Sequence, residues 1–269
     1  MSNRPTPTVL TIAGFDPYGG AGVGLDSKVI HALGGYALST ITALTVQNSL
    51  GVLEVSPTAV PLFKRTLFSL LDDIKVDAVK IGMLANREMI EVVVEAIEKY
   101  HLEKIVLDTV LVSSSGKRLL EESAIETMVE KLFPLVELIT PNIPEAQTLT
   151  HSLDVSDVTS LASSCMTLGT KGVLVKGGHS QDSSLAEDYF YSKEGEAFFV
   201  TSPRVQTTHT HGTGCFLSSA IATELAKSTP LPLAIERAKA FLYAQMKEAT
   251  ERLNLHYTNP SPQRREPLL

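Results

Sequence analysis

The chain has few of the residues that form disulfide or zinc frameworks, membrane-spanning helices or nucleic-acid-binding surfaces. Its 269 residues contain only two cysteines, Cys165 and Cys215, too few for a disulfide scaffold or a structural zinc site. No stretch approaches the ~18 consecutive apolar residues of a membrane-spanning helix. The formal net charge is -7 and no cluster of lysine or arginine stands out, which argues against a nucleic-acid partner. These absences favour a small-molecule partner.

The N-terminus also lacks the pattern of a secretory leader. The first residues, MSNRPTPTVLTIAGFDP, hold only a short apolar run before Gly14 and Asp16, too short for the core of a signal peptide. We therefore expect a cytoplasmic protein that contacts no membrane. The chain is 43% hydrophobic and 20% charged, which is ordinary for a protein with a large core.

Apolar segments of strand length alternate with segments of helical period along the chain. This alternation predicts an α/β fold with a mostly parallel sheet covered by helices on both faces. The expected strands are residues 8–14, 38–46, 76–84, 104–112, 137–142 and 172–178, and the expected helices between them are 21–34, 58–73, 86–100, 121–132 and 156–168. A hairpin is expected over 187–200, followed by helices 213–227 and 232–253. We predict one domain over 1–255 and an irregular tail over 256–269.

Polar residues stand at the predicted carboxyl ends of these strands, where open parallel sheets bind their ligands. Each of them alone is explained as well by a helix cap or by exposure to water. Their repetition at one end of the sheet favours a ligand site. They are Asp16, Gln47, Lys80, Asp108, Asn142, Glu145 and Lys176.

The sequence HGTGC opens the predicted helix at residue 213 and is a candidate anion site. The P-loop, dinucleotide and serine-hydrolase glycine patterns are all absent from the chain. Free N–H groups at a helix start attract anions, and Gly212 and Gly214 would let a phosphate approach the backbone. The same field predicts a lowered pKa for the Cys215 thiol.

Two other interpretations of HGTGC stay open on these grounds. The glycines could only shape a turn while Cys215 only packs in the core. Alternatively, His209, His211 and Cys215 could bind zinc, although their spacing fits no common zinc site. Magnesium prefers carboxylates together with substrate phosphates, and Asp108 and Glu145 match that preference.

Seven segments resemble, in order, the hydroxymethylpyrimidine and hydroxymethylpyrimidine-phosphate kinases of thiamine biosynthesis. The likeness extends from Thr8 to about Ala249, and the combination of THGTGC, TPNIPEA and VKGGH is specific, because related sugar kinases carry aspartate at position 215. The segments are TIAGFDPYGGAG (11–22), ITALTVQNSLGV (41–52), VKIGML (79–84), VLDTVLV (106–112), TPNIPEA (140–146), VKGGH (175–179) and THGTGC (210–215).

The resemblance implies a ribokinase-like fold, a three-layer sandwich with a small strand flap, commonly assembled as a homodimer. It implies two successive phosphoryl transfers from ATP, first to 4-amino-5-hydroxymethyl-2-methylpyrimidine and then to its monophosphate. Kinase activity on pyridoxal or pyridoxine is an alternative, since vitamin B6 kinases share the fold. A pyrimidine-binding regulatory protein without catalysis is another, although it would not need Cys215, Glu145 and Lys176 together.

Carried over residue by residue, the resemblance assigns Gln47 to the pyrimidine edge, because an amide offers both a donor and an acceptor. Gly14, Ala21 and Met83 complete the implied pocket. The sequence departs from the family at Phe15, Tyr18 and Phe216, where smaller residues are usual, and these bulky side chains could reshape the pocket. Cys165 matches no motif, and we predict that it is a core residue.

The resemblance also implies the catalytic and nucleotide-binding residues. Cys215 is implied as the group that takes the substrate hydroxyl proton, with the backbone of Gly212 and Gly214 as an anion hole. The implied ATP-binding residues are Lys176, Asn142 and Thr210, and the implied Mg²⁺ ligands are Glu145 and Asp108.

Overall fold

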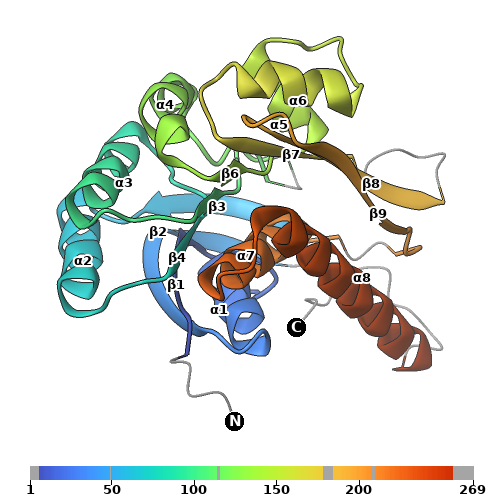
Figure 1. Cartoon of the computed structure of the whole chain (residues 1–269). Coiled ribbons are helices and arrows are strands. Elements are labelled where there is room, and N and C mark those ends of the chain that lie inside the picture. The colour runs from blue at the N-terminus through green and yellow to red at the C-terminus, as the bar shows by residue number, and fades with distance from the viewer. Residues whose placement is uncertain (1–5, 49, 114–115, 178–183, 208–209, 257–269) are drawn as a thin grey trace.

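The centre of the fold is a mostly parallel β-sheet (Figure 1). The computed structural model describes residues 6–48, 50–113, 116–177, 184–207 and 210–256, with side chains up to residue 249. Within these residues nine strands form one sheet in the order β3-β2-β1-β4-β5-β6-β7-β8-β9. They are β1 (Thr8–Phe15), β2 (Tyr36–Asn48), β3 (Gly51–Pro57), β4 (Ala78–Ile81), β5 (Ile105–Leu107), β6 (Leu138–Ile139), β7 (Gly172–Lys176), β8 (Leu185–Ser192) and β9 (Ala197–Pro203).

In the order of the sheet, the six neighbouring strands β2-β1-β4-β5-β6-β7 pair in parallel, and antiparallel strands lie at both edges. At one edge β3 pairs antiparallel with β2, and at the other β8 and β9 form an antiparallel hairpin on β7. The apolar strands are buried on both faces, as a covered parallel sheet requires. In β1, Val9 packs into one core layer while Leu10 and Ile12 pack into the other.

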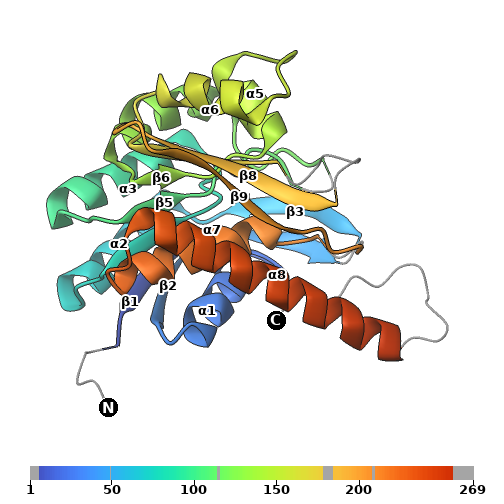
Figure 2. The ribbon, with the colours of Figure 1, turned by 45° about the vertical axis from the view of Figure 1, so that its right-hand side comes forward.

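Helices cover both faces of the sheet, which gives the expected three-layer sandwich (Figures 1 and 2). One core layer packs side chains of α1, α7 and α8 against the sheet, and the other packs those of α2 to α6. The bounds are α1 (Gly22–Ala32), α2 (Val60–Asp73), α3 (Arg87–Tyr100), α4 (Glu122–Thr127), α5 (Ile143–Thr150), α6 (Val158–Met166), α7 (Thr213–Ala226) and α8 (Leu231–His256).

Two elements were not expected from the sequence, the edge strand β3 and the short helix α5. Strand β3 is poorly buried on either side, so its residues lack the continuous apolar pattern that marks the central strands. Helix α5 has only eight residues, but Asn142 and Glu145 form a capping box at its start and Pro144 follows in its first turn. These capping residues were a signal for the helix.

The other elements match their predictions with shifted ends. The predicted hairpin is confirmed as β8 and β9, and its turn includes Gly195 in the left-handed region. The predicted helix over 121–132 is α4 followed by one turn of π-helix, Met128–Leu132. Helix α8 ends at His256, and the predicted tail beyond it lies outside the described residues. Among those residues, no helix is long and apolar enough to cross a membrane.

Candidate active site

A cavity of about 1090 Å³ lies where the parallel strands end. It receives residues from the ends of β1, β2 and β7, from the loops after β4 and β5, and from the starts of α5 and α7. Every residue that the resemblance assigned to the site lines this cavity: Gly14, Ala21, Gln47, Met83, Asp108, Asn142, Glu145, Lys176, Thr210, Gly212, Gly214 and Cys215.

Helix α7 points its N-terminus into the cavity, and two glycines make that approach possible. Gly212 precedes the helix with φ of 82°, and a Cβ there would overlap the carbonyl oxygen of Gly20. A Cβ on Gly214 would lie 3.1 Å from Lys176 Nζ and 3.3 Å from Asp108 Oδ2. Thr210 stands at the entry of the helix, where its carbonyl accepts from the Thr213 hydroxyl at 3.0 Å. The first turn therefore has the open N–H groups and dipole of an anion site.

A lysine and a carboxylate meet beside this turn. Lys176 Nζ donates to Asp108 Oδ1 at 2.8 Å, and the Thr140 hydroxyl donates to the same oxygen at 3.1 Å. Burial by itself would raise the pKa of Asp108, but the Lys176 and Lys80 cations hold its pKa below the usual value. Asp108 is therefore an ionised, buried carboxylate paired with a mostly buried cation.

Glu145 is the second carboxylate of the site, and it also caps α5. Its Oε2 accepts from the Asn142 backbone N–H at 2.8 Å, while Asn142 Oδ1 accepts from the Glu145 N–H at 2.8 Å. Burial raises the pKa of Glu145 to about 7, with Lys176 opposing the rise and the negative charge of Asp108 adding to it. Two carboxylates that repel each other are suited to share a divalent cation.

The donor set fits Mg²⁺ better than zinc. Across the described ranges, no group of three or more histidine, cysteine, aspartate or glutamate side chains could hold a metal ion. Asp108 and Glu145 supply two carboxylates, which suits a cation that takes its remaining ligands from phosphates and water. Of the zinc ligands considered from the sequence, His209 lies outside the described residues, and His211 belongs to no such group.

The prediction of a lowered pKa for Cys215 is wrong. Burial raises the pKa of the Cys215 thiol to about 11; the Lys80 cation lowers it, but the carboxylates of Asp26 and Asp108 add to the rise. The prediction took into account only the helix dipole, which lowers the pKa of the thiol. Burial and the two nearby negative charges raise that pKa. At neutral pH the thiol is protonated.

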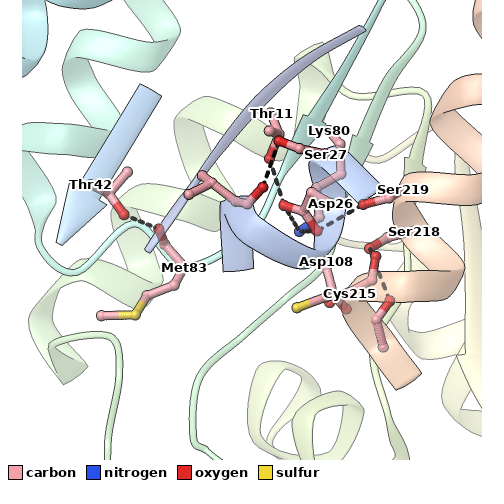
Figure 3. Close-up of polar contacts among 12 residues, drawn as sticks. Thr11, Asp26, Ser27, Thr42, Lys80, Met83, Asp108, Cys215, Ser218 and Ser219 are labelled. Carbon is pink, nitrogen blue, oxygen red and sulfur yellow. Dashed lines mark hydrogen bonds and ion pairs between the residues drawn. The ribbon is translucent and has the colours of Figure 1, made fainter. Parts of the chain in front are cut away.

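A buried ion pair lies behind Cys215, and Figure 3 shows it. Lys80 Nζ is 2.8 and 2.7 Å from the two carboxylate oxygens of Asp26, and both side chains are fully buried. Asp26 also accepts from the hydroxyls of Thr11 at 2.6 Å and Ser219 at 2.8 Å. The pair thus joins β1, β4, α1 and α7 (Figure 3).

Lys80 therefore differs from the other strand-end residues, because its side chain is fully buried in the pair with Asp26 and is not among the residues that line the cavity. The sequence contained a signal for this pairing. Asp26 lies on the buried side of an apolar helix and Lys80 lies within a buried strand, and opposite charges on two apolar faces are expected to pair.

Gln47 and Met83 line the same cavity. The Met83 carbonyl accepts from the Thr42 hydroxyl at 2.6 Å, which fixes the segment after β4 (Figure 3). A Cβ on Gly14 would lie 3.1 Å from Met83 Sδ, so glycine lets the thioether pack against β1. Ala21 precedes the first residue of α1. The lining of the cavity thus combines these small and apolar residues with the Gln47 side-chain amide.

Comparison with known proteins identifies the family. The phosphomethylpyrimidine kinase family model matches residues 16–259. The chain belongs to the phosphomethylpyrimidine kinase family. A hydroxymethylpyrimidine/phosphomethylpyrimidine kinase of Salmonella typhimurium is 42% identical over 243 residues, which cover 89% of this chain and 91% of that protein.

Solved structures of related kinases share the fold. The phosphomethylpyrimidine kinase of Clostridium difficile is 36% identical, with a TM-score of 0.76 over 90% of this chain and 100% of that one. An ADP complex of Bacillus subtilis pyridoxal kinase is 31% identical, with a TM-score of 0.82 over 91% of this chain and 93% of that one. The chain is therefore a kinase with a ribokinase-like fold.

The three bulky residues that the sequence analysis expected to reshape the pocket divide into two groups. Phe15 and Tyr18 line the cavity, so they can shape the pocket as expected. Phe216 does not line it, because its ring is fully buried and packs on Phe241 with centroids 5.1 Å apart. Cys165 is a buried core residue, as predicted, and burial raises its pKa to about 12.

His211 is the site residue that sequence reasoning missed within this family motif. The sequence analysis considered it only as a possible zinc ligand, together with His209 and Cys215. In the structure its Nε2 lies 3.0 Å from Asp16 Oδ2 and 3.1 Å from the Gln47 amide. Both partners are distant in the sequence, so no local pattern could have revealed these contacts.

Proposed function

We propose that the chain transfers the γ-phosphoryl group of ATP to the hydroxymethyl group of 4-amino-5-hydroxymethyl-2-methylpyrimidine and then phosphorylates the resulting monophosphate. The observation that carries this proposal is the composition of one cavity. An anion-binding helix start, the Lys176–Asp108 pair and the Gln47 amide all line it. The name of the 42% identical Salmonella relative supports the same substrates.

The start of α7 would bind the phosphoryl group during transfer. N–H groups of its first turn are preorganised donors for the charge that develops on the phosphoryl oxygens. The Lys176 cation, beside Gly214, would bind the ATP phosphates, and Asn142 and Thr210 would line their path. Asp108 and Glu145 would hold Mg²⁺, which when bound neutralises phosphate charge.

Cys215 would take the proton of the substrate hydroxyl. Only the thiolate can accept that proton, and its raised pKa makes the thiolate both scarce at neutral pH and strongly basic. Phosphoryl transfer passes through a loose transition state, so the hydroxyl proton needs to leave only late in the reaction. A scarce but strong base meets that requirement.

The test is an ADP-release assay with purified protein, ATP and Mg²⁺, offering the hydroxymethylpyrimidine, its monophosphate and pyridoxal in parallel. We expect release with both pyrimidines and none with Cys215→Ala. A Cys165→Ala variant is the matched control, because that cysteine is buried, is not among the residues that line the cavity, and should leave turnover intact. Equal turnover by Cys215→Ala would rule out the base role, and no turnover of either pyrimidine would rule out the substrate assignment.

Pyridoxal phosphorylation is the second candidate activity, and the likeness to the Bacillus subtilis pyridoxal kinase favours including it. The pyridoxal arm of the same assay decides between the two activities by kcat/KM.

We also propose a cytoplasmic homodimer. Leu44 and Val46 of β2 and Leu53 of β3 are more than half exposed and offer an apolar surface for a second copy. Sedimentation velocity would detect the dimer as a doubled mass.

A further inference from the structure

His211 connects the Gln47 amide to a buried carboxylate. Its Nε2 lies 3.0 Å from Asp16 Oδ2 and 3.1 Å from Gln47 Nε2. The ring packs tightly on the loop before α1, since a Cβ on Gly20 would lie only 2.6 Å from His211 Cδ2. One ring nitrogen therefore has two partners, and their chemistry decides where its proton lies.

Asp16 determines the state of that nitrogen. Burial by itself would raise the pKa of Asp16, but hydrogen bonds from His211 and from the backbone N–H groups of Tyr18 and Gly20 hold its pKa below the usual value. An ionised carboxylate can only accept hydrogen bonds, so His211 Nε2 must carry the hydrogen that faces it. The Gln47 atom beside the same N–H must then also be an acceptor, which is the amide oxygen.

The other end of the amide leads independently to the same orientation. Thr45 Oγ1 lies 3.1 Å from the Phe15 carbonyl oxygen and 3.2 Å from the Gln47 amide through Oε1. A hydroxyl has one hydrogen, and the carbonyl can only accept it. The Gln47 atom facing Thr45 must then be the NH₂ group. A half-turn of the amide, which exchanges its oxygen and nitrogen, satisfies both ends at once.

We propose that His211, fixed by Asp16, is a specificity-determining positioning residue that holds the Gln47 amide with its oxygen toward the α7 side of the cavity and its NH₂ group toward Thr45. This inference rests on the proposed function and deepens it. The remaining lone pair and N–H of the amide then face the cavity in a fixed order. A freely turning amide could instead match a ring edge of either polarity.

The fixed order selects a 4-amino pyrimidine over its 4-oxo analogue. With the hydroxymethyl group at Cys215, ring position 4 is its neighbour and falls on the α7 side, where the amide oxygen accepts from a 4-amino group. The Gln47 NH₂ group then donates to ring nitrogen 3. In the 4-oxo analogue both polarities are inverted, so carbonyl faces carbonyl and N–H faces N–H.

The experiment compares 4-amino-5-hydroxymethyl-2-methylpyrimidine with its 4-oxo analogue in the full-length chain. Both kcat/KM with ATP and Kd by calorimetry are measured for wild type, His211→Phe, His211→Gln and the exposed control His31→Phe. We expect wild type to prefer the amino compound, and His211→Phe to reduce that preference about tenfold or more, because the amide can turn. Glutamine, which can also donate to Asp16 and Gln47, should restore most of it.

The outcomes separate this inference from the proposed function. Turnover with an unchanged amino-to-oxo ratio in His211→Phe would leave the function standing and overturn the role of His211. Preferential binding of the amino compound that depends on His211, without any turnover, would overturn the function and support the inference. Failure of wild type to distinguish the two compounds in Kd would overturn the inference directly.

Discussion

Replacing Lys80 with methionine should destabilise the protein far more than removing an exposed lysine. Lys80 and Asp26 are fully buried, and their charged atoms are 2.7 and 2.8 Å apart. Burial by itself would lower the pKa of Lys80, but the charge of Asp26 raises it, so Lys80 is a cation. Methionine keeps the volume of the side chain and removes its charge. Asp26 would keep only the hydroxyls of Thr11 and Ser219 as partners.

The cost follows from the charge that is left behind. Removing one member of a buried ion pair costs about 3–5 kcal/mol, because the other charge stays desolvated without its counter-ion. Asp26→Asn should cost a similar amount for the same reason. The double variant removes both charges, so its loss should be clearly smaller than the sum of the two single losses. Each single loss is a large part of a typical stability of about 5–15 kcal/mol.

Urea unfolding followed by circular dichroism at pH 7 measures these differences. Lys64→Met is the matched control, because Lys64 lies 2.6 Å from Glu95 but the two side chains are 44% and 49% exposed, and water screens such pairs. Its midpoint should move little. Additive losses in the double variant, or a Lys80→Met loss no larger than that of Lys64→Met, would refute the view that this pair is ionised and mutually dependent.

The remaining predictions concern the cavity. Cys215→Ala should lose phosphoryl transfer while calorimetry still detects pyrimidine binding; loss of both would indicate a damaged pocket instead. The rate of wild type should rise with pH from 7 to 9, by up to about tenfold per unit, because the thiolate fraction grows below a pKa of about 11, whereas Cys215→Asp should give a flat profile. Gln47→Ala should raise the pyrimidine Kd about tenfold, and an unchanged Kd would remove Gln47 from the pocket. Gly214→Ala should lower kcat at least tenfold in steady-state assays, since its methyl group would crowd Lys176 Nζ at 3.1 Å; unchanged kcat would mean that this close approach is dispensable.

Much of the fold was predictable because buried parallel strands are continuously apolar and amphipathic helices repeat with helical period. The predicted ends of strands β1, β2 and β4 and of helices α1, α3 and α7 lie within a few residues of the observed ends. Strand β3 was missed because an exposed edge strand has no such pattern. Helix α5 was missed because eight residues are too few to establish a helical period, although the sequence contains the residues of its capping box, Asn142 and Glu145.

The sequence by itself determined which residues gather at the site, because parallel strands bring their carboxyl ends to one edge of the sheet. Motif order then distinguished Cys215 and Gln47 from ordinary polar residues. Only the tertiary structure decided the electrostatics and the partners. It paired Lys80 with Asp26 in the core, raised the pKa of Cys215 through burial, buried Phe216, and set His211 between Asp16 and Gln47. These outcomes depend on burial and on contacts between residues far apart in the chain, which no local pattern records.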